Sequence, residues 1–160
     1  MTTAIDTNIL LDILIPDEKY ILQSKILVEK YKEMGKLLIC EIVYSELASQ
    51  FPSSKDLERF LDDTGIQIQP SSRISLSIAG ERWKEYALKR TNVLQCSGCG
   101  KKLSISCPGC GNTISHRQHI ISDFIIGANA LTHADFLLSR DRGFYKTHFN
   151  DLVVKDKDYL

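Results

Sequence analysis

The sequence lacks the segments that mark membrane and secreted proteins. Its 160 residues contain no apolar run approaching the roughly 18 residues of a membrane helix. No basic stretch followed by an apolar one stands at the start, as it would in a secretory signal. With 43% hydrophobic residues, the chain can instead bury the core of one domain. We therefore expect a single cytoplasmic domain over residues 1–160, with no membrane contact.

Neither sign of charge is in excess, because 20 Lys and Arg residues balance 20 Asp and Glu residues. This balance excludes a uniformly basic protein that binds nucleic acid over its whole surface. The charges are unevenly spread, however: residues 73–119 hold 8 basic and 2 acidic residues, and residues 1–70 hold 7 and 12. The basic segment is compatible with a polyanionic partner, although an ordinary solvated helix face would have the same composition.

Cysteine is scarce outside one segment. Cys40 lies alone in an apolar run, where a small buried side chain is expected. The other four cysteines form two CxxCG motifs seven residues apart, and they are Cys96, Cys99, Cys107 and Cys110. Four thiolates at this spacing match a closed, tetrahedral Zn²⁺ site without an open position for a substrate. We therefore expect a small zinc-binding insertion with four cysteine ligands over residues 94–114, similar to a zinc ribbon.

Two roles for this insertion remain open. Arg90, Lys101, Lys102 and Arg117 lie nearby, which favours a flap that grips RNA or docks a partner. Alternatively, zinc only folds a loop that is too small for a core of its own.

Elsewhere, short β-prone runs alternate with helical patterns. After an opening strand that ends at Asp6, the expected strands are residues 36–40, 66–69, 135–139 and 152–154. The expected helices are residues 8–14, 17–34, 41–50, 55–64 and 72–89, and one that resumes at His116. This alternation predicts an α/β fold with a central parallel sheet in a three-layer α/β/α arrangement.

Four carboxylates occupy comparable places in this pattern. Asp6 follows the first strand, Glu46 lies within a helix, Asp123 lies early in a helix, and Asp141 follows a later strand. Each has a plain alternative explanation as a helix cap, turn residue or solvent-facing side chain. Because strand ends in a parallel sheet meet at one edge, we expect the four to converge. Clustered carboxylates repel one another and require cations, for which Mg²⁺ and Mn²⁺ are the natural choice.

The motifs around these acids resemble those of PIN-domain nucleases, particularly the VapC-like toxins of bacterial and archaeal toxin–antitoxin pairs. The matching segments are AIDTNILLDIL, EIVYSELAS, HIISDFIIGANAL and FLLSRDRGFYK, which cover most of the chain outside the cysteine segment. The resemblance implies a PIN-like fold and an endoribonuclease that depends on Mg²⁺ or Mn²⁺. It also implies an RNA substrate, an antitoxin partner and a homodimer.

The resemblance assigns roles residue by residue. The four acids correspond to the family's catalytic metal ligands, and Asn8 and Ser139 to the polar residues that support them. Arg140, Arg142 and Lys146 adjoin Asp141 and are expected to hold RNA phosphates, although surface solubility would explain them equally well. The cysteine insertion departs from the usual small toxin.

Three alternatives remain at this stage. A PIN fold with a zinc ribbon also occurs in ribosomal-RNA processing, so a processing endonuclease is the first. The second is a non-catalytic, zinc-stabilised adaptor that binds RNA or protein. The third is a phosphatase with Asp6 as nucleophile, which is disfavoured because the second aspartate of such enzymes is Asn8 here.

Overall fold

The computed structural model describes most of the chain. The described residues are 1–15, 18–89, 94–95, 102–114 and 120–156. None of the helices in these ranges is both long enough and apolar enough to cross a membrane.

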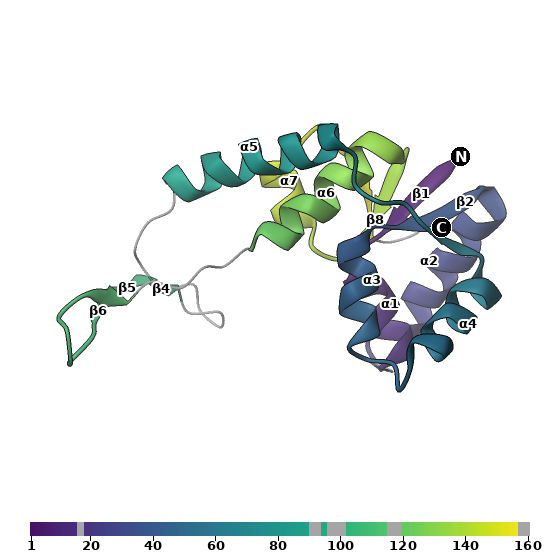
Figure 1. Cartoon of the computed structure of the whole chain (residues 1–160), viewed down its shortest axis with the longest axis horizontal. Helices are drawn as coiled ribbons and strands as arrows, with labels where there is room; N and C mark the ends of the chain where they lie inside the picture. Colours follow the sequence, from purple (N-terminus) through teal and green to yellow (C-terminus); the bar gives the residue numbers. More distant parts are fainter. Residues whose placement is uncertain (16–17, 90–93, 96–101, 115–119, 157–160) are drawn as a thin grey trace.

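A five-stranded parallel sheet forms the centre of the molecule (Figure 1). Its strands, in spatial order, are β3 (Ile66–Ile68), β2 (Lys36–Ile39), β1 (Thr2–Ile5), β8 (Phe136–Leu138) and β9 (Val154–Lys155). Every neighbouring pair in this order is parallel. The predicted α/β fold with a central parallel sheet is therefore confirmed.

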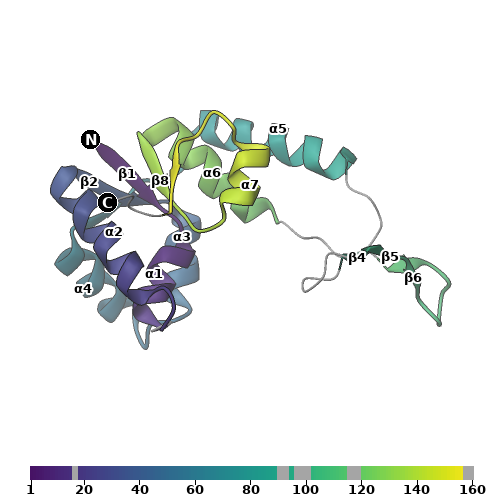
Figure 2. The same cartoon turned by 180° about the vertical axis from the view of Figure 1, so that it is seen from behind.

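Seven helices surround the sheet in the described part of the chain. They are α1 (Thr7–Leu14), α2 (Ile21–Met34), α3 (Glu41–Ala48), α4 (Ser54–Thr64), α5 (Arg73–Lys89), α6 (Ile121–His133) and α7 (Arg142–His148). Figures 1 and 2 show α1–α4 gathered on one side of the strands and α5–α7 on the other. The helices thus complete a three-layer arrangement.

Successive side chains of the strands are buried alternately in two hydrophobic cores, one on each face of the sheet. Ile5 and Leu138 are buried with α1–α4, whereas Ala4 and Leu137 are buried with α5–α7. Successive side chains of a strand point to opposite faces, so both faces of a covered parallel sheet must be apolar. This requirement explains the short, continuous apolar runs of the strands.

Two helices begin later than the sequence pattern predicts. The helix expected from residue 17 begins at Ile21, and residues 18–20 form a turn. Residues 116–119 of the helix expected from His116 lie outside the described residues. Ile120 has an extended backbone whose N–H the Asp123 carboxylate accepts, so α6 begins at Ile121. Asp123 is therefore in the first turn of α6, where a carboxylate satisfies a free helix amide.

Two small antiparallel hairpins lie between α5 and α6 in the sequence. Strand β4 (Leu94–Gln95) pairs with β5 (Lys102–Leu103), and β6 (Ile105–Ser106) pairs with β7 (Thr113–Ile114). In Figures 1 and 2, β4–β6 are drawn away from α1–α4. The position of these hairpins agrees with an insertion over residues 94–114, and the division of the chain stays a prediction.

Candidate active site

Asp6 is the buried centre of the candidate site. It follows β1 and occupies the N-cap position of α1, but its side chain makes no capping hydrogen bond. Instead, its Oδ2 accepts hydrogen bonds from Asn8 Nδ2 at 2.6 Å, Ser139 Oγ at 2.6 Å and Tyr145 OH at 3.4 Å. The carboxylate is thus held by residues from both ends of the chain.

Asn8 and Ser139 connect the ends of β1 and β8, which are neighbours in the sheet. Asn8 Nδ2 also donates to Ser139 Oγ at 3.1 Å, and Ser139 Oγ accepts the N–H of Asp141 at 3.0 Å. Ser139 is fully buried, so its hydroxyl needs these partners. Both side chains therefore contact the Asp6 carboxylate, and their supporting role stays a prediction.

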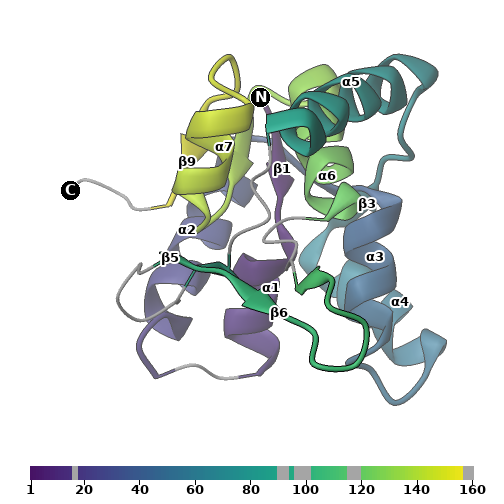
Figure 3. The same cartoon turned by 90° about the vertical axis from the view of Figure 1, so that its left-hand side faces the viewer.

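Glu46 reaches the site from the half-buried side of α3. Its Oε2 accepts a hydrogen bond from the Thr7 hydroxyl, in the first turn of α1. Figure 3 shows β1 between α7 on one side and α3 and α6 on the other. The helices that carry Glu46, Asp123 and Asp141 therefore flank the strand that ends at Asp6.

Asp123 and Asp141 both lie at the start of a helix. Asp123 Oδ2 accepts the N–H of Ile120 at 3.0 Å, and Asp141 Oδ1 accepts the N–H of Phe144 at 3.1 Å. Asp141 thus caps α7, as the simpler explanation of this residue supposes. A capping carboxylate has a second oxygen, so this bond does not prevent a further contact.

The pKa values of Asp6 and Tyr145 are raised by burial and by the acidic residues nearby. The pKa of the Asp6 carboxyl is raised from 3.8 to about 6, and burial is the main cause. The charges of Glu46 and Asp123 act in the same direction as burial, and the hydrogen bonds from Ser139 and the Thr7 backbone oppose it. Burial also raises the pKa of Tyr145 well above 10, as do the charges of Asp6, Asp123 and Asp141. The acids are therefore close enough to influence the same two buried groups.

The four acids do not surround one point in the described residues. Within the described ranges, no three His, Cys, Asp or Glu side chains are grouped closely enough to hold a metal ion. Glu46, Asp123 and Asp141 each accept a hydrogen bond from a donor nearby instead.

The whole sequence identifies the fold family. Residues 3–150 match the PIN domain. The chain belongs to the PIN domain family. The predicted resemblance to PIN-domain proteins is therefore confirmed, and a search of curated proteins found no match.

Two solved structures share the fold of this PIN domain. One is VapBC2 from Rickettsia felis, bound to a DNA fragment from its promoter, with a TM-score of 0.60 and 18% identity over 99% of this chain and 100% of that one. The other is VapBC-1 from nontypeable Haemophilus influenzae, with a TM-score of 0.61 and 15% identity over 98% of each chain. At these identities the likeness concerns the fold.

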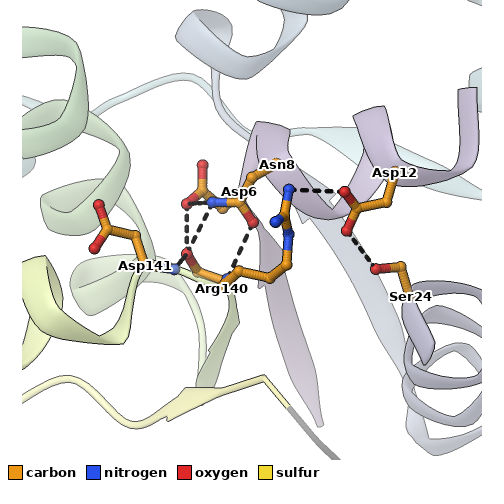
Figure 4. A network of polar contacts seen from close by, with 7 residues as sticks. Asp6, Asn8, Asp12, Ser24, Arg140 and Asp141 are labelled. Carbon is orange, nitrogen blue, oxygen red and sulfur yellow. Dashed lines mark hydrogen bonds and ion pairs between the residues drawn. The ribbon is translucent and has the colours of Figure 1, made fainter. Parts of the chain in front are cut away.

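The basic residues around Asp141 differ in their surroundings. Arg140 Nη2 lies 2.7 Å from Asp12 Oδ1, and Arg142 Nη1 lies 3.4 Å from Asp156 Oδ1 (Figure 4 shows the first pair). Lys146 is exposed and forms no ion pair with any residue of the described ranges. Of the three predicted phosphate contacts in this PIN domain, Lys146 is the best placed to make one.

Three residues of the site carry no clear signal in the sequence. Thr7 holds Glu46, Tyr145 donates to Asp6, and Asp12 pairs with Arg140. Thr7 and Asp12 lie in the first helix, where they look like a cap and a polar interruption. A polar residue at the start of a helix that follows a strand-end acid is the one signal that could have suggested Thr7.

The second CxxCG motif lies in the hairpin that joins β6 and β7. Cys107 accepts the N–H of Gly111 at its carbonyl, 2.8 Å away, and Gly111 has a left-handed backbone with φ of +71°. Backbone N–H groups of Cys110 and Gly109 lower the pKa of the Cys107 thiol. Cys96 and Cys99 lie outside the described residues, and so do Arg90, Lys101 and Arg117. The half of the four-cysteine site that the structure describes therefore has backbone amides directed at a thiol, as in a metal-binding turn.

Proposed function

We propose that this PIN domain is a metal-dependent endoribonuclease. PIN domains are in general nucleases that use divalent metal ions. The observation that carries the proposal is the buried Asp6 carboxylate, whose pKa rises to about 6 by burial and through the charges of Glu46 and Asp123. Such a group favours a bound cation, because a cation stabilises its charged form.

The donor set of the site suits Mg²⁺ or Mn²⁺. Asp6, Glu46, Asp123 and Asp141 offer only oxygen atoms, which hard divalent cations prefer. The Asp6 carboxylate already has the fixed orientation that a metal ligand needs, since Asn8 and Ser139 both donate to its Oδ2. We assign the four acids as the metal ligands and these two polar residues as their support.

When bound, the metal would polarise a phosphodiester group and lower the pKa of the attacking water. The chain itself then needs no nucleophilic side chain. Its residues hold the ion and position the RNA, for which the exposed Lys146 provides a positive charge one turn into α7. A contact of this kind orients the RNA backbone without reading its sequence.

Within this chemistry we propose a toxin of a toxin–antitoxin pair, with an antitoxin protein as partner and a homodimer as the assembly. The support is the shared fold with two VapBC structures, over almost the full length of the chains. Processing of ribosomal RNA is the second candidate, favoured by the hairpin turn that directs amides at Cys107. A small antitoxin reading frame next to the gene would distinguish the toxin from the processing enzyme.

We also propose that Cys96, Cys99, Cys107 and Cys110 bind one structural Zn²⁺. The turn at Cys107–Cys110 supports half of this site, because it lowers the pKa of a thiol that must be deprotonated to bind zinc. A four-thiolate site is closed, so the zinc has no part in hydrolysis.

The test is cleavage of single-stranded RNA of mixed sequence in the presence of Mn²⁺. The wild type should cleave it, EDTA should stop the reaction, and Asp6→Asn and Asp123→Asn should each lose at least about a hundredfold in rate. Asp62→Asn is the matched control, since Asp62 is exposed on α4. A wild type that leaves RNA intact at high concentration would refute the proposed activity. Equal rates in all four proteins would refute the assigned site.

A further inference from the structure

Arg140 lies in the loop that joins β8 to α7, and Arg142 is the first residue of α7; both are engaged with acids of this chain. The closer pair joins Arg140 Nη2 to Asp12 Oδ1 at 2.7 Å. An arginine in this position next to Asp141 would ordinarily be assigned to RNA phosphates. Its engagement with a buried acid indicates a different role.

Asp12 is an unusual residue for the interior of a short helix. Its side chain is 2% exposed, whereas that of Arg140 is 33% exposed. The second oxygen of Asp12, Oδ2, accepts a hydrogen bond from Ser24 Oγ of α2 at 2.7 Å (Figure 4). A buried carboxylate is costly unless it is paired and hydrogen-bonded, and both of its oxygens are satisfied here. Asp12 is thus a fixed anchor between α1 and α2.

Arg140 is held at its backbone as well as at its side chain. Its N–H donates to Asn8 Oδ1 at 3.1 Å, and its guanidinium lies over the Tyr20 ring, 4.2 Å from the centroid. The backbone bond and the ion pair both join the loop to α1, since Asn8 and Asp12 lie one turn apart on that helix. The loop therefore has two points of attachment at one residue.

The neighbours of Arg140 are the residues that the site depends on. Ser139, just before it, donates to Asp6 Oδ2 at 2.6 Å. Asp141, just after it, donates its N–H to Ser139 Oγ at 3.0 Å. Any shift of Arg140 would move both of these groups relative to Asp6. The attachment of Arg140 to α1 thus sets the geometry of the candidate metal ligands.

We propose that Asp12 and Arg140 are a pair of positioning residues, which fix the loop of residues 139–141 against α1 so that Ser139 reaches Asp6 and Asp141 stays next to Ser139. Arg140 is accordingly not an RNA-phosphate ligand. The effect of this pair on hydrolysis rests on the proposed nuclease function, but its effect on the loop does not. The two proposals can therefore fail separately.

Kinetics distinguish the positioning role from phosphate binding, because Asp12→Asn lowers kcat only if the pair positions the loop. If the pair positions the loop, Asp12→Asn and Arg140→Gln each lower kcat about tenfold to a hundredfold with KM unchanged. The double variant then falls no further than either single one, because both remove the same contact. If Arg140 binds phosphate, Asp12→Asn frees it and leaves kcat intact, whereas Arg140→Gln raises KM.

The salt dependence of RNA affinity adds a second criterion. The affinity for RNA falls as the salt concentration rises. Losing one phosphate contact makes the slope of log affinity against log salt shallower by about 0.7 on single-stranded RNA. We expect this reduction for Lys146→Gln and not for Arg140→Gln. A reduced slope for Arg140→Gln would overturn the proposal.

The loop itself can be observed without any activity, by amide hydrogen exchange in metal-free protein. The N–H groups of Arg140 and Asp141 donate to side-chain oxygens, so their protection reports the position of the loop. We expect protection at both amides to fall at least about tenfold in Asp12→Asn. Protection equal to that of the wild type would overturn the proposal, even if the protein cleaves no RNA.

A second ion pair of the same length tests whether the loss of any salt bridge lowers kcat. Arg82 Nη2 and Asp151 Oδ2 are also 2.7 Å apart, on α5 and after α7. Asp151→Asn should leave kcat and the two loop amides unchanged. Ser24→Ala is the milder variant, which removes one bond to Asp12 and should lower kcat in the same direction as Asp12→Asn. If Asp151→Asn reduces kcat as much as Asp12→Asn does, the positioning role is refuted.

Discussion

Removing the charge of Asp6 should stabilise the metal-free protein at neutral pH, although it should abolish hydrolysis. The folded protein holds the pKa of this carboxyl at about 6, against 3.8 as the ordinary value, and burial is the main cause. An ionised Asp6 therefore opposes folding until a cation compensates it. Asn at this position keeps an oxygen that can accept the bonds of Asn8 and Ser139, and it carries no charge.

The sign and the size follow from the two pKa values. Between about pH 4 and pH 6 the folded state binds more protons at Asp6 than the unfolded state, so stability falls as the pH rises. The contribution is complete below the unfolded pKa and is lost once the pH has passed the folded pKa. A difference of about 2 pH units, at about 1.4 kcal/mol each, amounts to about 3 kcal/mol.

The measurement is the free energy of unfolding by urea in EDTA, at several pH values, for the wild type and Asp6→Asn. The stability of the variant minus that of the wild type should rise by about 3 kcal/mol between about pH 4 and pH 7. Other titrating groups are common to both proteins and cancel in this difference. Asp62→Asn, which changes an exposed acid on α4, should give a difference that stays flat.

Mn²⁺ should reverse the order of the two proteins. At about a thousand times the dissociation constant, a ligand that binds only the folded state adds about 4.1 kcal/mol, which exceeds the deficit of about 3 kcal/mol. Near neutral pH the wild type should gain this stability and Asp6→Asn should not. If the difference between the two proteins in EDTA does not change with pH, the buried charge is not the source of instability and the reasoning is wrong.

Two further predictions concern packing and zinc. Gly127→Ala on α6 should destabilise the protein by about 1–3 kcal/mol in urea unfolding, since a Cβ there would lie 2.7–3.0 Å from the buried ring of Phe149. Gly80→Ala on α5 meets no atom within 4 Å and should stabilise by up to about 1 kcal/mol, so equal losses would contradict this account. Cys107→Ser should lower the zinc content of purified protein, whereas Cys40→Ser should not, because burial raises the pKa of the Cys40 thiol to about 11. An unchanged zinc content in Cys107→Ser would refute the four-thiolate site.

Many helix boundaries could be predicted because the residues that start and end a helix are recognisable in the sequence itself. Ser53 caps α4 by accepting the N–H of Asp56, and Gly65 ends it with φ of +72°. Both caps depend only on neighbouring residues in the sequence, so they can be predicted without the tertiary structure. The starts of α2 and α6 could not be placed in this way, because the periodic pattern extends into residues that a turn or an extended cap takes up.

The part of the candidate site that follows directly after neighbouring strands could be predicted from the sequence. A parallel sheet brings the residues after β1 and β8 together, so Asp6, Ser139 and Asp141 follow from the strand assignment alone. The contacts of Tyr145 and Asp12 could not be predicted. Tyr145 meets Asp6 across 139 residues, and no local pattern specifies which buried hydroxyl reaches which acid. Side-chain packing decides such contacts, and packing depends on the whole fold.

Asn8 shows why the identity of one side chain separates two chemistries on a similar scaffold. Its amide donates to Asp6 and Ser139 from Nδ2 and accepts the Arg140 N–H at Oδ1, so the residue needs both a donor and an acceptor. An aspartate at this position, as in a phosphatase with Asp6 as nucleophile, could accept from Arg140. When ionised it could not donate to Asp6, and it would place a second charge about 2.6 Å from a buried carboxylate. The donor at Asn8 keeps the Asp6 carboxylate oriented, which suits a metal ligand better than a nucleophile.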